Sequence, residues 1–333
     1  MYRWNGQHPL GVLATLWVGA SRSSALEARR AHDPLPQRKA TLVLDNAFVY
    51  PRPSWFGKLV AWVANFRWFL VLRRALFRVL PFVKLQSDVR DVVYLNWVVP
   101  LDAVRPLIPE GVRVVTSDGK TLLTILTYSH GHFGPSLLGP LRRLLPSPLQ
   151  SNWRLYVETI FDEPPPSPVV LFIKNVFSST LYSVGSRLFS DALPSHVAAS
   201  FCHRADGNGY HTVIEGGTGS APGFLATAVP AEQRELPEPF APFFADWKDA
   251  VAVLCLQDAA IAHAADNDRL AQAGIDLPID LAGVIPLATT AYQPGSLLES
   301  LEAVAEPFAF CVPAVEFKVL WERSYPVSSS VDP

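Results

Sequence analysis

Four polar side chains alternate along one short stretch of the sequence, and they form the strongest candidate for a chemical site. The stretch NWRLYVETI, residues 152–160, carries Asn152, Arg154, Tyr156 and Glu158 at every second position. On a β-strand this spacing points all four side chains to one face. An amide, a cation, a phenol and an anion suit a small polar ligand, with Arg154 as anion anchor and Glu158 as acid or base. The alternative is the solvated face of a half-exposed antiparallel strand.

Three further residues could take part in such chemistry. Lys174 lies in the apolar run VVLFIKNVF, where a lowered pKa would make its amine a nucleophile, although a charge on an edge strand is the commoner role. His196 has a side chain that titrates near neutrality, so it could act as acid, base or hydrogen-bond partner. Ser195 precedes it, but neighbours on a strand point apart and do not form a nucleophile–base pair by themselves.

The sequence does not predict a metal or cofactor site. His130 and His132 in YSHGHFGP have the spacing of ligands on a strand, but the glycines indicate a loop and no third ligand follows at a suitable distance. The glycine-rich run at 214–223 lacks the lysine of a phosphate-binding loop and the spacing of a dinucleotide fingerprint. We therefore expect no metal and no cofactor.

Cysteine usage argues against a disulfide-stabilised protein, and the net charge argues against a nucleic-acid-binding protein. The three cysteines are odd in number, far apart and without a Cys-x-x-Cys pair, which indicates buried thiols in a reducing compartment: Cys202, Cys255 and Cys311. The chain of 333 residues has a net charge of −2, so no overall field favours nucleic acid. We expect a cytoplasmic protein, with peripheral association with the inner membrane left open.

The elements that must position these residues begin near residue 89, where period-two strands start. Strands, a hairpin and a few helices then follow, which predicts an α+β fold with mostly antiparallel strands. Residues 178–191 are predicted to be helical after a serine cap. Residues 243–274 are predicted to form the clearest helix of the domain, ending at Gly274.

The first third of the chain differs from the rest. Residues 1–54 are expected to form an irregular extension, in which the apolar run at 9–20 only faintly resembles a signal peptide. Residues 55–85 are expected to be an amphipathic helical segment, followed by the main domain at 86–325. A helix would place three arginines on one stripe, which is typical of a helix at a membrane surface or of one packed on the domain with its charges in water: Arg67, Arg74 and Arg78.

Three motifs occur in an order that resembles one protein family. YLNWVVPLDAVRPLIPEGVRV (94–114), NWRLYVE (152–158) and SRLFSDALPSHVAASF (186–201) resemble consecutive segments of the bacterial DUF2071 family, over about residues 88–322. That family is grouped with the acetoacetate decarboxylase-like fold. The resemblance therefore implies an antiparallel β-barrel or double cone around a central cavity, with the polar row at 152–158 on its wall.

The resemblance also bears on catalysis. In acetoacetate decarboxylases a lysine pair follows the proline of the segment that resembles Leu193-Pro194, and one of these lysines forms a Schiff base. This chain has Ser195 and His196 there, so the nucleophile is missing from the expected position. We expect a pocket for a small carbonyl or carboxylate ligand, with Asn152, Arg154, Lys174 and Ser195 binding it.

Two function classes remain open from the sequence. An enzyme would use lyase- or hydrolase-type acid/base chemistry through Glu158, His196 and Tyr156. The other class is a non-catalytic protein that binds a small molecule or lipid and associates with membranes through residues 55–83. The expected partners are a small-molecule ligand and a membrane surface, with homo-oligomerisation left open.

Overall fold

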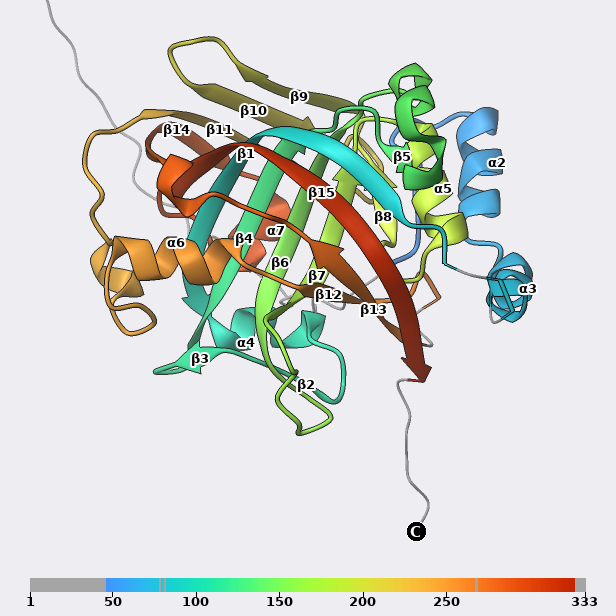
Figure 1. Ribbon diagram of the computed structural model, residues 1–333, viewed down its shortest axis with the longest axis horizontal. Coiled ribbons are helices and arrows are strands. Elements are labelled where there is room, and N and C mark those ends of the chain that lie inside the picture. Colours follow the sequence, from blue (N-terminus) through green and yellow to red (C-terminus); the bar gives the residue numbers. More distant parts are fainter. Residues whose placement is uncertain (1–45, 78, 81, 267–268, 327–333) are drawn as a thin grey trace, which may run out of the picture. The chain divides into compact units, whose positions relative to one another are not determined.

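The computed structural model describes residues 46–77, 79–80, 82–266 and 269–326 (Figure 1). They belong to the compact unit Leu42–Pro333. Most of the expected extension at 1–54, with the apolar run at 9–20, lies outside the described residues.

The centre of the fold is a closed ring of strands. Each strand pairs with the next, and the last returns to pair with the first (Figure 1). The pairs are antiparallel except for β7 with β12. The ring strands in spatial order are β1 (Leu85–Pro100), β4 (Lys120–Ser129), β6 (Leu149–Ile160), β7 (Val169–Phe177), β12 (Ala259–His263), β13 (Arg269–Asp276) and β15 (Phe308–Pro326).

A second group of strands continues from the ring. The 19-residue strand β15 pairs with β14 through residues 309–311 and with β13 through residues 318–326, so one edge serves two neighbours. The sheet then extends through β14 (Ile285–Pro294), β11 (Phe224–Pro230), β10 (Tyr210–Glu215) and β9 (Ser200–Ala205). Short strands attach at the ends: β2 (Val112–Val114), β3 (Thr116–Ser117), β5 (Gly134–Pro135) and β8 (Ser195–Val197).

Alternation along β6 separates two cores. Trp153, Leu155 and Val157 point to one face and pack with residues of the second strand group, where the Trp153 and Phe224 rings meet edge to face at 5.7 Å. Tyr156 points to the other face, together with Phe310 of β15 and residues of helix α6 (Trp247–Cys255). The predicted period-two pattern therefore distinguishes the inside of the ring from its outer face.

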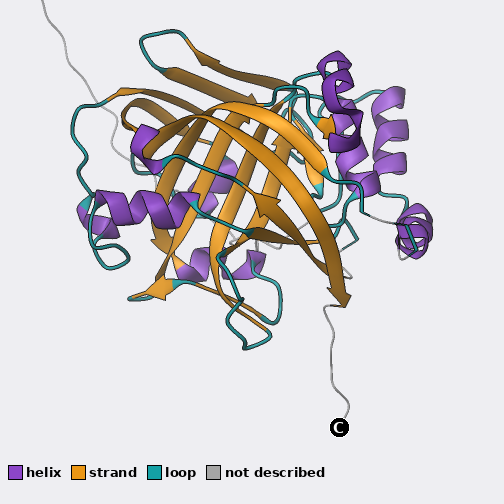
Figure 2. Ribbon diagram, in the orientation of Figure 1, coloured by secondary structure: helices purple, strands orange, loops and turns teal. Residues whose placement is uncertain are grey.

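Helices lie at both ends of the ring (Figure 2). The segment expected to be helical forms α2 (Trp55–Ala64) and α3 (Arg67–Phe77), and α5 (Thr180–Phe189) matches the helix predicted at 178–191. Shorter elements are α4 (Leu101–Val104), η1 (Arg105–Leu107), η2 (Ser136–Leu144), η3 (Glu238–Phe240), η4 (Leu281–Gly283) and α7 (Ser296–Ser300). Within the described ranges, no helix has the length and apolar character needed to cross a bilayer.

A buried arginine fastens α2 to α5. The Arg187 guanidinium is fully buried and donates to the carbonyl oxygens of Asn46, Ala64 and Ser195 at 2.5, 3.3 and 3.3 Å. These acceptors come from the chain before α2, the end of α2 and strand β8. The side chain thus joins α5 to acceptors that lie 141, 123 and 8 residues away in the sequence.

The helix predicted at 243–274 is wrong beyond Cys255. The helical part begins at the cap residue Asp246, whose side chain accepts from the Asp249 amide, and ends after nine residues. The alanine-rich remainder forms β12 and β13, which pair from Ala259 with Gly274 onward. Alanine favours helix in isolation, but β7 and β15 offer edges that take up the backbone hydrogen bonds of this hairpin.

Candidate functional site: a cavity inside the strand ring

The ring encloses a cavity of about 950 Å³. Its wall is mainly apolar, with residues contributed by β1, β4, β6, β13 and β15 and by helices α3 and α5. Asn152 and Arg154 of β6 line it, as the period-two pattern predicts. One end, near Tyr94 and Arg154, is deeply buried, whereas the end near α3 and α5 includes exposed side chains such as Leu181.

Arg154 is the central polar group of the buried end. Its side chain is 2% exposed, and Nη2 donates to the carbonyl oxygen of Leu254 at 2.5 Å. That carbonyl belongs to the last turn of α6, the negative end of the helix dipole. The guanidinium carbon lies 5.4 Å from the Tyr94 ring centroid and 5.6 Å from that of Tyr156.

The Arg154 guanidinium keeps unused hydrogen-bonding capacity. Its Nε is buried without a hydrogen-bond partner. Among the described residues, no Asp or Glu forms an ion pair with it. A buried charge without a counter-ion is costly. The site is therefore suited to an anion that reaches it from the cavity.

Tyr156 lies beside Arg154 and is fixed by three elements. Its hydroxyl lies 2.9 Å from the Thr124 hydroxyl and 3.2 Å from the Leu254 carbonyl oxygen. Thr124 in turn donates to the side-chain oxygen of Asn96 at 2.7 Å. Burial raises the pKa of both Tyr94 and Tyr156, so each phenol stays neutral and acts as a hydrogen-bonding group rather than as a base.

A chain of side-chain hydrogen bonds follows the same wall. His130 lies between the Ser87 hydroxyl, 2.8 Å from Nδ1, and the Gln150 carbonyl oxygen, 2.6 Å from Nε2. Gln150 donates to Asn152 at 2.7 Å, and Asn152 donates to the Tyr128 hydroxyl at 3.1 Å. These directions require that His130 donates from Nε2 to the Gln150 oxygen. Burial lowers the pKa of His130 to about 4.

The two histidines considered as metal ligands have separate surroundings. His130 forms the hydrogen bonds with Ser87 and Gln150. His132 lies in a loop, as the flanking glycines predict, and has a positive φ of 55°. Across the described part of the chain, no group of three His, Cys, Asp or Glu side chains could hold a metal ion.

The prediction of a four-residue row on the cavity wall needs correction, because Tyr156 and Glu158 are not among the lining residues. Tyr156 faces the same side as Arg154, whereas Glu158 does not. Its side chain is exposed. The pairing of β6 with β7 ends at Tyr156, after which β6 pairs with the short strand β2, with an irregularity between Arg113 and Val114. Beyond Tyr156, β6 is no longer paired with a ring strand on the β7 side. The face that lines the cavity at Arg154 is therefore exposed to solvent at Glu158.

Lys174, Ser195 and His196 are not part of the cavity wall that Arg154 lines. A bulge in the pairing of β6 with β7 sets Lys174 opposite Trp153, whose side chain belongs to the outer core. The Lys174 amine is 3.5 Å from His196 Nε2, while His196 Nδ1 is 2.7 Å from the Ser220 hydroxyl. Burial, followed by the charges of Lys174 and Arg187, lowers the pKa of His196.

Sequence reasoning missed several groups at the buried end. Tyr94 faces Arg154 from β1, and Leu254 supplies a backbone oxygen that no side-chain pattern can reveal. Cys255 lies next to them, and burial raises the pKa of its thiol to about 12, which makes it an inert neutral group. The period-two pattern of β1 could have identified Tyr94. The Leu254 carbonyl and Cys255 could be identified only if the residue at which α6 ends were known.

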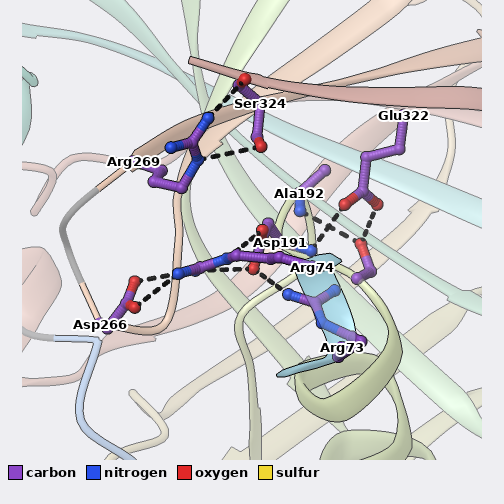
Figure 3. A network of polar contacts seen from close by, with 9 residues as sticks. Arg73, Arg74, Asp191, Ala192, Asp266, Arg269, Glu322 and Ser324 are labelled. Atoms are coloured by element: carbon purple, nitrogen blue, oxygen red, sulfur yellow. Dashed lines mark hydrogen bonds and ion pairs between the residues drawn. The ribbon is translucent and has the colours of Figure 1, made fainter. Parts of the chain in front are cut away.

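Ion pairs form the rim at the other end of the cavity (Figure 3). Asp191, which follows α5, accepts from Arg73 and from Arg74, the latter at 2.7 Å. Arg74 also pairs with Asp266 at 2.8 Å. Glu322 of β15 accepts from the Asp191 amide at 2.7 Å, and burial raises its pKa. Helix α3 is thus tied to the segment after α5 and to the β12–β13 connection, and the segment after α5 is in turn tied to β15.

Comparisons with known proteins agree with the sequence resemblance. Residues 86–239 match the family model DUF2071, described as an uncharacterized conserved protein. No curated protein sequence matches the chain.

Several solved structures are similar in backbone. The enduracididine biosynthesis enzyme MppR with pyruvate has 12% identity and a TM-score of 0.49 over 75% of this chain and 92% of its own. An acetoacetate decarboxylase-like enzyme from Sphingomonas wittichii RW1 has 11% identity and 0.49, over 74% and 94%. The acetoacetate decarboxylase of Legionella pneumophila has 8% identity and 0.48, over 77% and 95%. These values support no inference about activity.

The buried His130 should make stability depend on pH. Because its folded pKa of about 4 lies below the ordinary value of about 6.5, the unfolded chain gains a proton as pH falls between them and the folded chain does not. The free energy of unfolding should therefore drop on acidification, with about 3 kcal/mol from this residue. Urea titrations at several pH values should show a smaller drop for His130→Gln. The half-exposed His211→Gln is the matched control, and an unchanged slope for His130→Gln would contradict the assignment.

Proposed function

We propose that the domain, in which residues 86–239 match the DUF2071 family model, binds a small carbonyl or carboxylate ligand in its ring cavity. The observation that carries the proposal is Arg154, a buried cation that lines the cavity and has no acidic partner among the described residues. A carboxylate would accept from the guanidinium donors that the Leu254 carbonyl leaves unused.

The groups around Arg154 support binding better than proton transfer. Asn152 adds an amide, and Tyr94, Tyr128 and Tyr156 add phenols whose pKa burial raises. Glu158 is exposed, and His196 lies outside the cavity. The acid/base roles considered for these two residues therefore have no support from the geometry, and we favour a binding role for the cavity.

Replacement of Arg154 should remove the anchor. Arg154→Gln keeps a polar side chain but loses the charge, so carboxylates should bind about ten- to hundredfold more weakly, in line with the value of a charge-assisted hydrogen bond. Calorimetric titration with butanoate and acetoacetate measures this change. Arg113→Gln, at a side chain that is 67% exposed, is the matched control. Equal affinity of Arg154→Gln and wild type would exclude Arg154 as the anchor.

Schiff-base chemistry has no candidate lysine in the cavity. None of the described residues that line it is a lysine, and Ser195 and His196 occupy the positions where the resemblance would put the nucleophile. Lys174 is half-buried but lies on the outer side of β7, next to His196.

Borohydride reduction of the protein in the presence of acetoacetate should therefore leave its mass unchanged. Neither a hydroxyl nor an imidazole forms an imine with a ketone. Intact mass spectrometry is the measurement, and an acetoacetate decarboxylase treated in the same way is the positive control. An adduct mapped to Lys174 would overturn this expectation and make that amine a nucleophile.

A second candidate function is attachment to a membrane surface through residues 55–83. Helices α2 and α3 expose large apolar side chains, among them Trp55 and Trp68 at 78% and Leu72 at 67%. Residues 46–87 contain Lys and Arg but neither Asp nor Glu. Exposed aromatic and aliphatic groups with basic neighbours favour the interface of an anionic bilayer.

The double substitution Trp55→Ser and Trp68→Ser should reduce binding to vesicles of phosphatidylcholine and phosphatidylserine. Flotation of the full chain measures this, and added salt should weaken binding of the wild type. Point changes are preferable to removal of the segment, because Arg73 and Arg74 of α3 pair with Asp191. Val304→Ser, 58% exposed on another part of the surface, is the control. Equal flotation of the double variant and the wild type would rule out this candidate.

A further inference from the structure

The cavity is much larger than a small carboxylate needs. Its volume of about 950 Å³ lies at the upper end of the range for drug-sized ligands, roughly 300–1,000 Å³. Both Tyr94 and Leu85 of β1 line it. These two residues are nine steps apart on the strand, at most about 30 Å at about 3.3 Å per residue, so the lining follows β1 over more than half of its length.

Between its two ends the wall is apolar. Valines and a phenylalanine of β1 and β15 form much of it, alongside Leu126 of β4: Val89, Val92, Val312, Val315 and Phe317. The polar groups gather at the ends, with Arg154 at the buried end and the Asp191 ion pairs at the rim. Such a distribution matches a ligand with one charged head and a long hydrocarbon chain.

The rim continues into exposed apolar surface. Phe77, Leu80, Phe82, Leu181 and Phe189 line the cavity and are each between 38% and 72% exposed. The arginines at this end that point to Asp191 are already paired with it. Arg269 and Arg323 also line the cavity, but Arg269 donates to Ser324 and Arg323 lies over the Trp321 ring. Arg154 is the lining arginine that is both buried and without an acidic partner among the described residues. The carboxylate is therefore placed at the buried end, and the hydrocarbon chain leaves the cavity between α3 and α5.

We propose that the ligand is a long-chain monocarboxylate, with its head on Arg154 and its hydrocarbon chain directed along β1 and β15 toward α3 and α5. This inference rests on the proposed function, because it takes Arg154 as the anchor. It adds the class of ligand and its direction in the cavity.

Titration of the full chain with butanoate, octanoate, dodecanoate and hexadecanoate, below their aggregation limits, tests the class. Affinity should rise about two- to fourfold per added methylene until the cavity is filled. Dodecanol should bind about ten- to hundredfold more weakly than dodecanoate, and Arg154→Gln should abolish this preference. Binding of all four acids with equal affinity overturns the long-chain class and leaves the proposed function intact. Failure of every acid to bind overturns both.

A substitution at Gly185 of α5 tests the proposed direction of the ligand's hydrocarbon chain. This residue lines the cavity, and a Cβ there would meet no atom within 4 Å. Gly185→Leu should weaken hexadecanoate at least tenfold and leave butanoate unchanged, with Gly185→Ala as the matched control. Leu181→Glu, at an exposed rim position, provides a second variant should the first fail to fold. Equal effects on both acids, or none on hexadecanoate in the folded variants, overturn the proposed direction.

Discussion

The pairing of β1 with β15 is the constraint on which the remaining structure depends. It runs from Leu85 with Val319 to Asn96 with Phe308 and converts an open sheet into a ring. In an open antiparallel sheet, alternating side chains face the core on one side and solvent on the other. In a closed ring, alternating side chains face the interior cavity on one side and the outer core on the other. The other edge of β15 pairs with β14 along one part of its length and with β13 along another. The pairing with β14 attaches the second strand group to the ring.

Inside the ring, the electrostatics depend on one group. At the rim, Arg73 and Arg74 form ion pairs with Asp191, and Arg74 forms a second ion pair with Asp266. Glu322 there accepts from the Asp191 amide, and Arg269 donates to Ser324. Arg154 has only a carbonyl at the end of α6 and the faces of two tyrosines. Such contacts compensate part of the cost of desolvating the charge, and the remaining part is what an anion in the proposed binding mode would offset.

Much of this could be predicted from periodicity, and the exceptions have identifiable causes. Alternation placed Asn152, Arg154 and Tyr156 on one face correctly, because β6 is paired on both sides there and its register with β4 is regular. It failed at Glu158, where the strand leaves the ring. It could not foresee the bulge that sets Lys174 opposite Trp153. Such irregularities depend on the partner strand, which the local sequence does not encode.

Contacts between residues that are distant in the sequence could not be predicted either. The pairing of Arg74 with Asp191 joins residues 117 positions apart, and neither neighbourhood indicates the other. The alanine-rich run after Cys255 has the composition of a helix, and only the free edges of β7 and β15 decide that it becomes a hairpin. Composition in that run reflects the space available inside the ring rather than a local backbone preference.

The small side chains of that hairpin have a consequence for how such a protein can diversify. Ala260 and Ala273 both face the cavity from β12 and β13, while the backbone hydrogen bonds that hold the ring do not depend on side-chain atoms beyond Cβ. Larger aliphatic groups at these two positions would shorten or narrow the interior without changing strand order or register. The size of the interior is therefore an adjustable property of this scaffold, separable from both its architecture and the position of Arg154.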